Sequence, residues 1–520
     1  MEKRNGFNSK LGFVLAAAGS SVGLGNLWSF PYKTSQNGGA SFVIVYIISV
    51  IVLGSILSIA EVFVGKRAEA NAVSAYKKIR KNFGWVGLLS IVIALFIAFY
   101  YVVLGGYTIK YTVNSFSNNT NTLESFSSNI GLVILYTAIF LIISVVIISF
   151  GVKKGIENAS KILMPALIVI LIGIVIYCLC LGSGVKEGLN YYLNPDFKAL
   201  GFKGVLAAMS QAFFSLSTGA GVLLAYGSYA GKDVKIGSSV LWIAFFDTFV
   251  ALLAGLAIFP AIYHYKAETG IELQNNGIVL LFSSMPIVFG NLGVIGKIVS
   301  FLFFGMVSIA AITSVISILE VVSQYLIQRF KLKRVIASTI AATLSFLVSI
   351  PIGISLGFEL SGKDSLRIAG RNLLDVFDLV TTSVFIPISC LFLALVSGWF
   401  MYKYESKKDA FSIKLLSENY KKDGMDLGWF SKIYSFIIKY LAPILILLIE
   451  IFGIVDIIFP KIGDTRVFSL SGLTIELIAI GILGLIIFIY FVFLKNKETG
   501  NNSDELKTKE KGLWLNKRLD

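Results

Sequence analysis

Charged residues, histidine and cysteine are all scarce in this sequence of 520 residues. Charged side chains make up 14% of it, there is one histidine, His264, and the three cysteines lie inside apolar runs. Such a composition argues against a transition-metal centre, a nucleophile–base pair and a disulfide framework, so we expect no enzyme activity. Hydrophobic residues account for 56% of the chain. A water-soluble fold cannot bury so much apolar surface, so lipid must surround most of the protein.

About twelve apolar segments are long enough to cross a bilayer core, which takes about 20 residues. They predict an all-α polytopic membrane protein. We place the spans at residues 11–34, 41–65, 84–113, 130–150, 159–182, 202–230, 237–264, 297–329, 333–357, 370–402, 431–459 and 471–495.

The basic residues indicate how these spans are oriented. The formal net charge is +15, and Lys and Arg gather in the loops after the second, fourth, sixth, eighth and tenth spans. Residues 115–129, after the third span, contain neither. The positive-inside rule therefore predicts that both termini are cytoplasmic, and it accounts for the charge without a nucleic-acid partner. We expect a multi-pass protein of the plasma membrane, of the bacterial inner-membrane type.

Two of the spans are interrupted by glycines and small polar residues. These lie at Gly19–Asn26 in the first span and Ser210–Gly221 in the sixth, five spans apart, as in an inverted repeat of five helices. Lipid offers no hydrogen-bond partner to the backbone freed by a break. Freed carbonyls can bind a hard cation, and the N-terminus of a half-helix favours a carboxylate, so such a pair predicts a transport site. The alternative is that the glycines only allow close helix packing.

Other polar residues within the spans also need partners. Asp247 lies near the middle of the seventh span, where an unpaired carboxylate costs a few kcal/mol, so a cation or proton partner is expected. Thr313 and Ser314 offer adjacent hydroxyls in the eighth span, although such hydroxyls often bond back to their own helix. For Glu61 and Glu320, a structural partner or a helix-break cap is as good an interpretation as ion binding.

The first-span motif resembles one known family. The stretch Ala17-Ala-Gly-Ser-Ser-Val-Gly-Leu-Gly-Asn-Leu-Trp28, followed by Phe30-Pro-Tyr and Asn37-Gly-Gly, is similar to the neurotransmitter:sodium symporters, in particular to bacterial amino-acid carriers like the leucine transporter. The resemblance runs from about Arg4 to Trp399. It implies five-helix repeats at 11–182 and 202–402, helices eleven and twelve at 431–495, a cytoplasmic segment at 1–10 and a cytoplasmic tail at 496–520.

The resemblance also implies where ions and substrate bind. It implies two sodium sites and no organic cofactor. Sodium site one would use Ser21, Asn26, Ser215, Asp247 and the substrate carboxylate. Sodium site two would use Gly19, Val22, Ala310, Thr313 and Ser314. An amino-acid substrate would contact Ser21, Leu24, Gly25, Ile97, Tyr101, Phe214, Ser215, Ser217, Ala220, Ser314 and Ile318.

Departures from the family pattern concern the pocket and the gates. Ala220 stands where leucine carriers have a large aromatic residue, so we expect a hydrophobic substrate, with an aromatic amino acid able to use the extra space unless neighbours refill it. Members of the family usually close each side of the site with a gate that contains an ion pair. At the outer gate the acid is kept as Asp378, but Ser29 stands where the base is expected. At the inner gate Arg4, Ser228 and Tyr229 are kept, but Gln328 stands where the acid is expected.

The expected activity is sodium-coupled import of such an amino acid by alternating access. Asp247 supplies a fixed negative charge where many animal members have Asn and need chloride, so chloride is not expected to be required, and a proton could be carried back. Two alternatives remain open. One is a substrate-sensing receptor that does not transport, and the other is a carrier driven by protons, with Asp247 as the proton carrier.

Overall fold

The structure of the protein is a computed structural model. It describes residues 6–116, 122–273, 277–363, 366–403, 406–459, 461–462, 465–466 and 468–494. Arg4 of the predicted inner gate and the predicted tail at 496–520 lie outside these residues.

Helices are the regular elements of the first half of the described chain. Its helices are α1 (Lys10–Ser21), α2 (Phe30–Gln36), α3 (Ala40–Ser49), α4 (Ser55–Ala68), α5 (Ala72–Ile79), α6 (Gly84–Asn114), α7 (Leu123–Ser128), α8 (Ile130–Ser149), α9 (Asn158–Leu179), α10 (Val185–Leu193), α11 (Phe197–Ser215), α12 (Val222–Ser228) and α13 (Ile236–Thr269).

The second half adds two short hairpins to further helices. The helices are α14 (Gly277–Val279), α15 (Met285–Asn291), α16 (Gly293–Phe330), α17 (Arg334–Leu360), α18 (Leu373–Leu379), α19 (Ile386–Leu395), α20 (Lys407–Phe411), α21 (Ile413–Lys422), α22 (Ser431–Phe436), α23 (Ala442–Ile458) and α24 (Leu470–Ile489). Antiparallel pairing joins β1 (Arg367–Ile368) to β2 (Arg371–Asn372) and β3 (Lys461–Ile462) to β4 (Thr465–Arg466).

Short π-helical and 3₁₀ segments join or extend several of these helices. The π segments are Gly25–Ser29, Val50–Gly54, Val152–Glu157, Leu280–Ser284, Val380–Phe385, Val396–Phe400, Ile437–Leu441 and Tyr490–Leu494. The 3₁₀ segments are Lys81–Phe83 and Gly428–Phe430.

The helices agree with the predicted spans. Ten continuous helical stretches in the described chain are long and apolar enough to cross a membrane, and α1 together with Gly25–Gln36 forms an eleventh span, bent by 48°. The predicted sixth span is divided between α11 and α12, with residues 216–221 between them. An all-α polytopic membrane protein is thus confirmed, and the breaks fall in the first and sixth spans.

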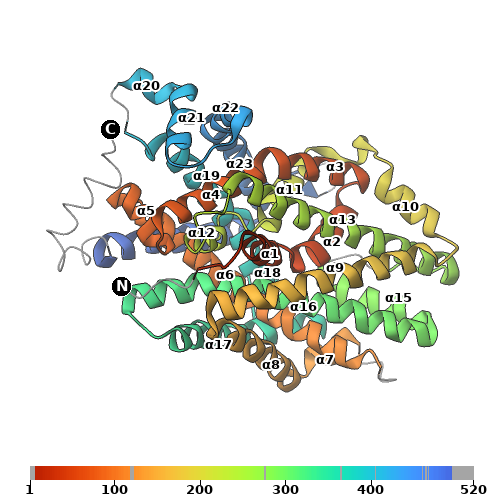
Figure 1. The fold of residues 1–520 in the computed structure, drawn as a ribbon. Coiled ribbons are helices and arrows are strands. Elements are labelled where there is room, and N and C mark those ends of the chain that lie inside the picture. The colour runs from red at the N-terminus through yellow and green to blue at the C-terminus, as the bar shows by residue number, and fades with distance from the viewer. Residues whose placement is uncertain are drawn as a thin grey trace.

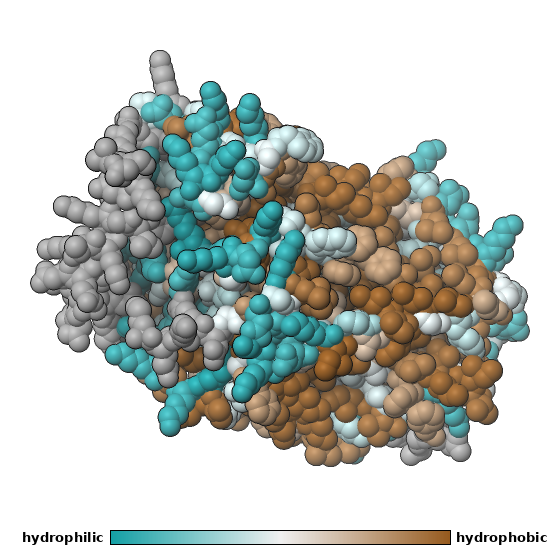
Figure 2. All heavy atoms as spheres, in the orientation of Figure 1, coloured by the Kyte–Doolittle hydropathy of each residue, from teal (hydrophilic) through white to brown (hydrophobic). Residues whose placement is uncertain are grey.

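The long helices pack side by side with their connections at two ends. In Figure 1, α5 and α20 lie at the left end of the bundle, and α10 and α15 lie at the right end. Figure 2 shows hydrophobic side chains over the middle of this face, with hydrophilic ones gathered toward both ends. This band has the distribution expected for a surface that faces lipid.

The first span is enclosed by other helices. α1 packs against α9, α13 and α16, and α12 packs against α4. Glycines allow the second of these contacts, because a Cβ at Gly65 would meet the backbone of Leu224 and one at Gly227 would meet the backbone of Val62. Both broken spans therefore lie inside the bundle, where protein atoms rather than lipid surround the breaks.

Candidate ion and substrate site

The break in the first span follows α1, which ends at Ser21. Val22 has an extended backbone, with φ −70° and ψ 100°. The N–H of Leu24 donates to the Tyr101 hydroxyl at 2.9 Å, and the N–H of Gly23 donates to Asn26 Oδ1 at 3.1 Å. Because side chains rather than lipid satisfy these groups, the break is stable within the membrane.

The break in the sixth span is held in a similar way by the second span. Ser217, Gly219 and Gly221 all have positive φ, which ends α11 and lets α12 begin in a new direction. The N–H of Gly219 donates to Glu61 Oε2 at 2.8 Å, and Ser389 Oγ donates to the Gly219 carbonyl at 2.7 Å. Of the two interpretations of Glu61, its contact with Gly219 supports the helix-break cap.

Asp247 joins the two breaks. Its carboxylate accepts hydrogen bonds from Asn26 Nδ2 at 2.8 Å, from Ser215 Oγ at 2.7 Å and from the Tyr46 hydroxyl at 3.4 Å. Asn26 Nδ2 also donates to Ser215 Oγ at 3.2 Å. Asn26, Ser215 and Asp247 are fully buried or nearly so. The structure therefore brings together the three side chains predicted for sodium site one.

The residues predicted for sodium site two lie together on the other side of the first break. Ser314 Oγ donates to the carbonyls of Ser20 at 3.0 Å and Val22 at 3.3 Å. Thr313 Oγ1 bonds back to its own helix, as the alternative interpretation expected, donating to the carbonyls of Ala310 at 3.0 Å and Ile309 at 3.1 Å. A Cβ added at Gly19 would lie 3.5 Å from Thr313 Cβ. The carbonyls and hydroxyls gathered here are all oxygen atoms, the donor type that hard cations prefer.

A small cavity of about 30 Å³ lies between the two breaks. Nine of the eleven residues predicted to contact substrate line it: Ser21, Gly25, Ile97, Tyr101, Phe214, Ser217, Ala220, Ser314 and Ile318. Leu24 and Ser215 do not line it, and Ser20, Gly23, Val222 and Ile386 are additions. A volume of this size holds about two water molecules, so an amino acid can enter only if the lining moves.

Comparison with known proteins identifies the family. The model of the sodium:neurotransmitter symporter family matches residues 4–122 and 117–497. A relative named as an uncharacterized sodium-dependent transporter from Haemophilus influenzae is 32% identical over 474 residues, covering 86% of this chain and 98% of the relative. The chain belongs to the sodium:neurotransmitter symporter family.

Other relatives agree with this membership. Another sodium-dependent transporter, from Bacillus subtilis, is 32% identical over 458 residues, covering 85% of this chain and 96% of the relative. The mouse sodium-dependent neutral amino acid transporter B(0)AT2 is 28% identical over 325 residues, covering 55% of this chain and 44% of the relative. A crystal structure of MhsT in complex with L-phenylalanine has a TM-score of 0.76 at 34% identity, covering 87% of this chain and 100% of that chain. The predicted family and fold class are confirmed.

In this symporter a basic residue that the sequence reasoning did not place lies beside the predicted outer gate. Lys33, one helical turn after Ser29, lies with its ammonium 5.9 Å from the ring centroid of Phe214 and interacts electrostatically with Asp378. Ser29 itself donates to Gln211 Oε1 at 3.0 Å, and Gln211 Nε2 donates to the Gly25 carbonyl at 3.0 Å. Thus Ser29 ties the two breaks together, and Lys33 places a positive charge near Asp378.

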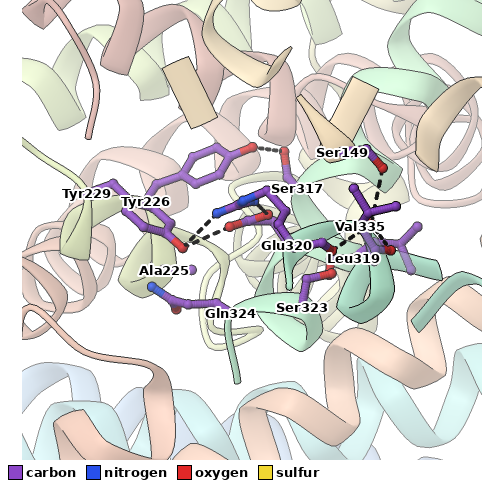
Figure 3. A network of polar contacts seen from close by, with 12 residues as sticks. Ser149, Ala225, Tyr226, Tyr229, Ser317, Leu319, Glu320, Ser323, Gln324 and Val335 are labelled. Carbon is purple, nitrogen blue, oxygen red and sulfur yellow. Dashed lines mark hydrogen bonds and ion pairs between the residues drawn. The ribbon is translucent and has the colours of Figure 1, made fainter. Parts of the chain in front are cut away.

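Beside the predicted inner gate lies an ion pair between neighbouring helices of the second half (Figure 3). The Tyr229 hydroxyl donates to Glu320 Oε1 at 2.9 Å, and Arg334 Nη1 lies 2.7 Å from Glu320 Oε2. Gln324 Nε2 donates to Ser228 Oγ at 2.6 Å. Of the two interpretations of Glu320, the Arg334 contact supports the structural partner. Gln328 Oε1 accepts instead from the backbone and side-chain amides of Asn71, both at 2.8 Å.

Sequence reasoning did not single out four side chains as parts of this site: Tyr46, Gln211, Lys33 and Arg334. Tyr46 is fully buried and its hydroxyl lies 3.2 Å from Ser215 Oγ. A tyrosine or glutamine inside an apolar run gives a weak signal, because such residues are also common in ordinary helix packing. Lys33 gave a better signal, since a lysine one turn beyond the expected basic position lies on the same helical face.

Proposed function

We propose that this protein is a sodium-coupled importer of hydrophobic amino acids that works by alternating access. The observation that carries the proposal is the buried cluster of Asn26, Ser215 and Asp247 where the two broken helices meet. A carboxylate at this depth is costly without a cation. A sodium ion between these side chains would supply the missing charge.

Two sodium ions fit the oxygen-rich positions on either side of the first break. At site one, the Ser21 carbonyl, Asn26, Ser215 and Asp247 would bind the ion. The Asn26 amide would first have to turn, since its nitrogen faces Asp247 and its oxygen faces the N–H of Gly23. At site two, the carbonyls of Gly19, Val22 and Ala310 and the hydroxyls of Thr313 and Ser314 would bind the ion.

The substrate would lie between the breaks with its charged ends on the backbone. Its carboxylate would accept from the N–H groups of Leu24 and Gly25 and from the Tyr101 hydroxyl, which already lies 2.9 Å from the Leu24 nitrogen. The ammonium would face carbonyls of the sixth-span break near Ser215 and Ser217. Because the carboxylate would also complete sodium site one, ion and substrate would raise each other's affinity by the same factor.

The walls of the cavity favour an apolar side chain. Ile97, Phe214, Ala220, Val222, Ile318 and Ile386 line it. Ala220 is the small member of this wall and is almost fully buried, so it leaves room for a larger group. The relatives that carry neutral amino acids and the L-phenylalanine bound to MhsT support the same class of substrate. We infer that phenylalanine and similar side chains bind better than alanine.

A thermal-shift panel of amino acids on the purified protein tests this proposal. We expect stabilisation by aromatic and large aliphatic amino acids in sodium buffer and much less in potassium buffer. Uptake driven by a sodium gradient into proteoliposomes then distinguishes a carrier from a receptor, because a receptor would bind without flux. Stabilisation by alanine or glycine equal to that by phenylalanine would refute the assigned pocket.

The orientation in the membrane follows the positive-inside rule. We infer that the end holding α5 and α20 is cytoplasmic and that the end holding α10 and α15 is external, in a plasma membrane of the bacterial inner-membrane type. The fixed charge of Asp247 makes chloride unnecessary for sodium binding. Cysteine labelling checks this orientation. Single cysteines are introduced into the α10 and α5 regions of a cysteine-free variant, and intact cells are treated with an impermeant reagent.

A further inference from the structure

A second and larger cavity, of about 500 Å³, lies at the end of the bundle that holds α15. It is formed by the last turns of α6, by α7, by the segment from Phe282 to Gly290 and by the first turns of α16. Lys110 at this cavity is nine residues beyond Tyr101 on α6, which corresponds to about 14 Å along the helix. The cavity is therefore separate from the site between the breaks, and its volume is in the range of ligand pockets.

Most of its lining is apolar, and the charged residues in it are both positive. Tyr111, Leu123, Phe126, Phe282 and Phe289 supply buried apolar surface. Lys110 and Lys297 are the two lysines that line the cavity, and none of its sixteen lining residues, all of them described, is acidic. The lining therefore favours a ligand with one negative charge and an apolar body.

Lys110 is the most informative of these residues. It lies inside a membrane-spanning helix with 4% of its surface exposed, and its ammonium is 5.5 Å from the ring centroid of Phe126. Among the described residues, no acidic side chain or hydrogen-bond acceptor pairs with it. The ring face of Phe126 is a weak partner for this ammonium, so an anion bound in the cavity would stabilise it further.

Three hydroxyl groups could hold an acidic head group beside Lys110. The Tyr111 hydroxyl is buried and has no hydrogen-bond partner in the described structure. The hydroxyls of Ser115 and Ser300 lie 3.2 Å apart on the cavity wall and can turn toward a ligand. A free amino acid fits less well, because its ammonium would find no acidic side chain in this lining.

We propose that this cavity binds an anionic amphiphile, with the acidic group on Lys110 and the apolar body on the phenylalanine side. Ile287 lines the cavity and is exposed, as are Ile295 and Ile298 on the adjacent turn of α16, so the cavity borders the apolar surface of the bundle. Membrane lipid can therefore reach it. The acidic group could come from an anionic phospholipid or from a free long-chain carboxylate, and the two share this chemistry.

Photolabelling of the purified full-length protein in phosphatidylcholine nanodiscs tests the proposal. The probe is a twelve-carbon fatty acid with a diazirine, and the labelled peptides are mapped by mass spectrometry. We expect saturable labelling in residues 110–126 and 282–300. Lys110→Met should raise the half-saturating concentration about tenfold or more, because it removes one partner of a buried charge pair. Lys110→Arg should keep the affinity.

Two variants keep the result interpretable. Lys198→Met removes an exposed lysine from the start of α11, away from this lining, and should leave labelling unchanged. Gly290→Leu adds bulk to the cavity lining at a position where a Cβ meets nothing within 4 Å, and should abolish labelling. Competition by phosphatidylglycerol would identify a phospholipid as the source, and competition by laurate alone would identify a free acid. Three results would overturn the proposal. Labelling could be absent, or it could persist equally in Lys110→Met and Gly290→Leu. A zwitterionic amino acid could also displace the probe as well as laurate does.

Discussion

Replacing Asp247 with asparagine removes one charge from the proposed sodium site one and leaves its shape almost unchanged. The carboxylate now accepts from Asn26, Ser215 and Tyr46, and an amide oxygen can still accept from one or two of them. A unit charge about 4 Å from a sodium ion contributes about 4 kcal/mol at an effective dielectric constant of about 20. Burial of the carboxylate without the ion is itself costly, which offsets part of this gain.

A net loss of about 2 kcal/mol is therefore expected, equivalent to sodium binding about 30-fold weaker. Since sodium and substrate affinities are linked, apparent substrate affinity at a fixed, subsaturating sodium concentration should fall as well. The measurement is a sodium titration of thermal stability at constant phenylalanine. Asp196→Asn is the matched control, because Asp196 is an exposed N-cap of α11 and asparagine caps a helix equally well.

The result that would refute this reasoning is a sodium midpoint within twofold of the wild type. The same variant also tests the role of the fixed charge. Chloride should begin to strengthen sodium binding to Asp247→Asn and should have no effect on the wild-type protein. A variant that keeps its sodium midpoint and stays insensitive to chloride would remove Asp247 from the site.

Three other substitutions test the sixth-span break, the substrate pocket and the outer gate. Glu61→Gln replaces a charged acceptor for the Gly219 N–H by a neutral one and should cost about 1 kcal/mol, seen as a lower Tm than that of a Glu187→Gln control in an exposed part of α10. Ala220→Phe should shift substrate preference from aromatic toward small amino acids in a competition assay, and an unchanged rank order would contradict the pocket. If Lys33 is the outer-gate base, Lys33→Met should change the rate of substrate release more than Ser29→Ala does. Equal release rates in the two variants would exclude this role.

Much of the architecture could be predicted from the sequence because local patterns carry it. Apolar runs define the spans, and the Gly and Ser residues at 19–26 and 210–221 mark the two breaks. Asp247 stood out because a carboxylate in the middle of a span needs a partner. Each of these signals lies within about twenty residues of chain, so no knowledge of the packing was needed.

The partners of these residues could not be predicted in the same way. Gln211 meets Ser29 across 182 residues of sequence, and Glu61 meets Gly219 across 158. Such pairs depend on how helices rotate against one another, and a rotation of one residue turns a side chain by about 100°. Glu320 is an example, because the sequence alone does not distinguish a structural partner from ion binding. The side chain of Arg334, 2.7 Å away, supports the structural partner.

The contacts between the second and sixth spans have a consequence for transport. Tyr46 contacts Ser215, Ser58 Oγ lies 3.0 Å from Thr218 Oγ1, and Glu61 caps Gly219. The second span thus contacts the sixth-span break through three side chains at different positions along the helix. In the described structure, the eighth span is hydrogen-bonded to the first break through one side chain, Ser314, which donates to two carbonyls. Breaking the first set of contacts would expose several buried polar groups at once, which is costly in lipid. The second and sixth spans should therefore move as one body, and the contact between Ser314 and the first break is the weaker place at which the site can open.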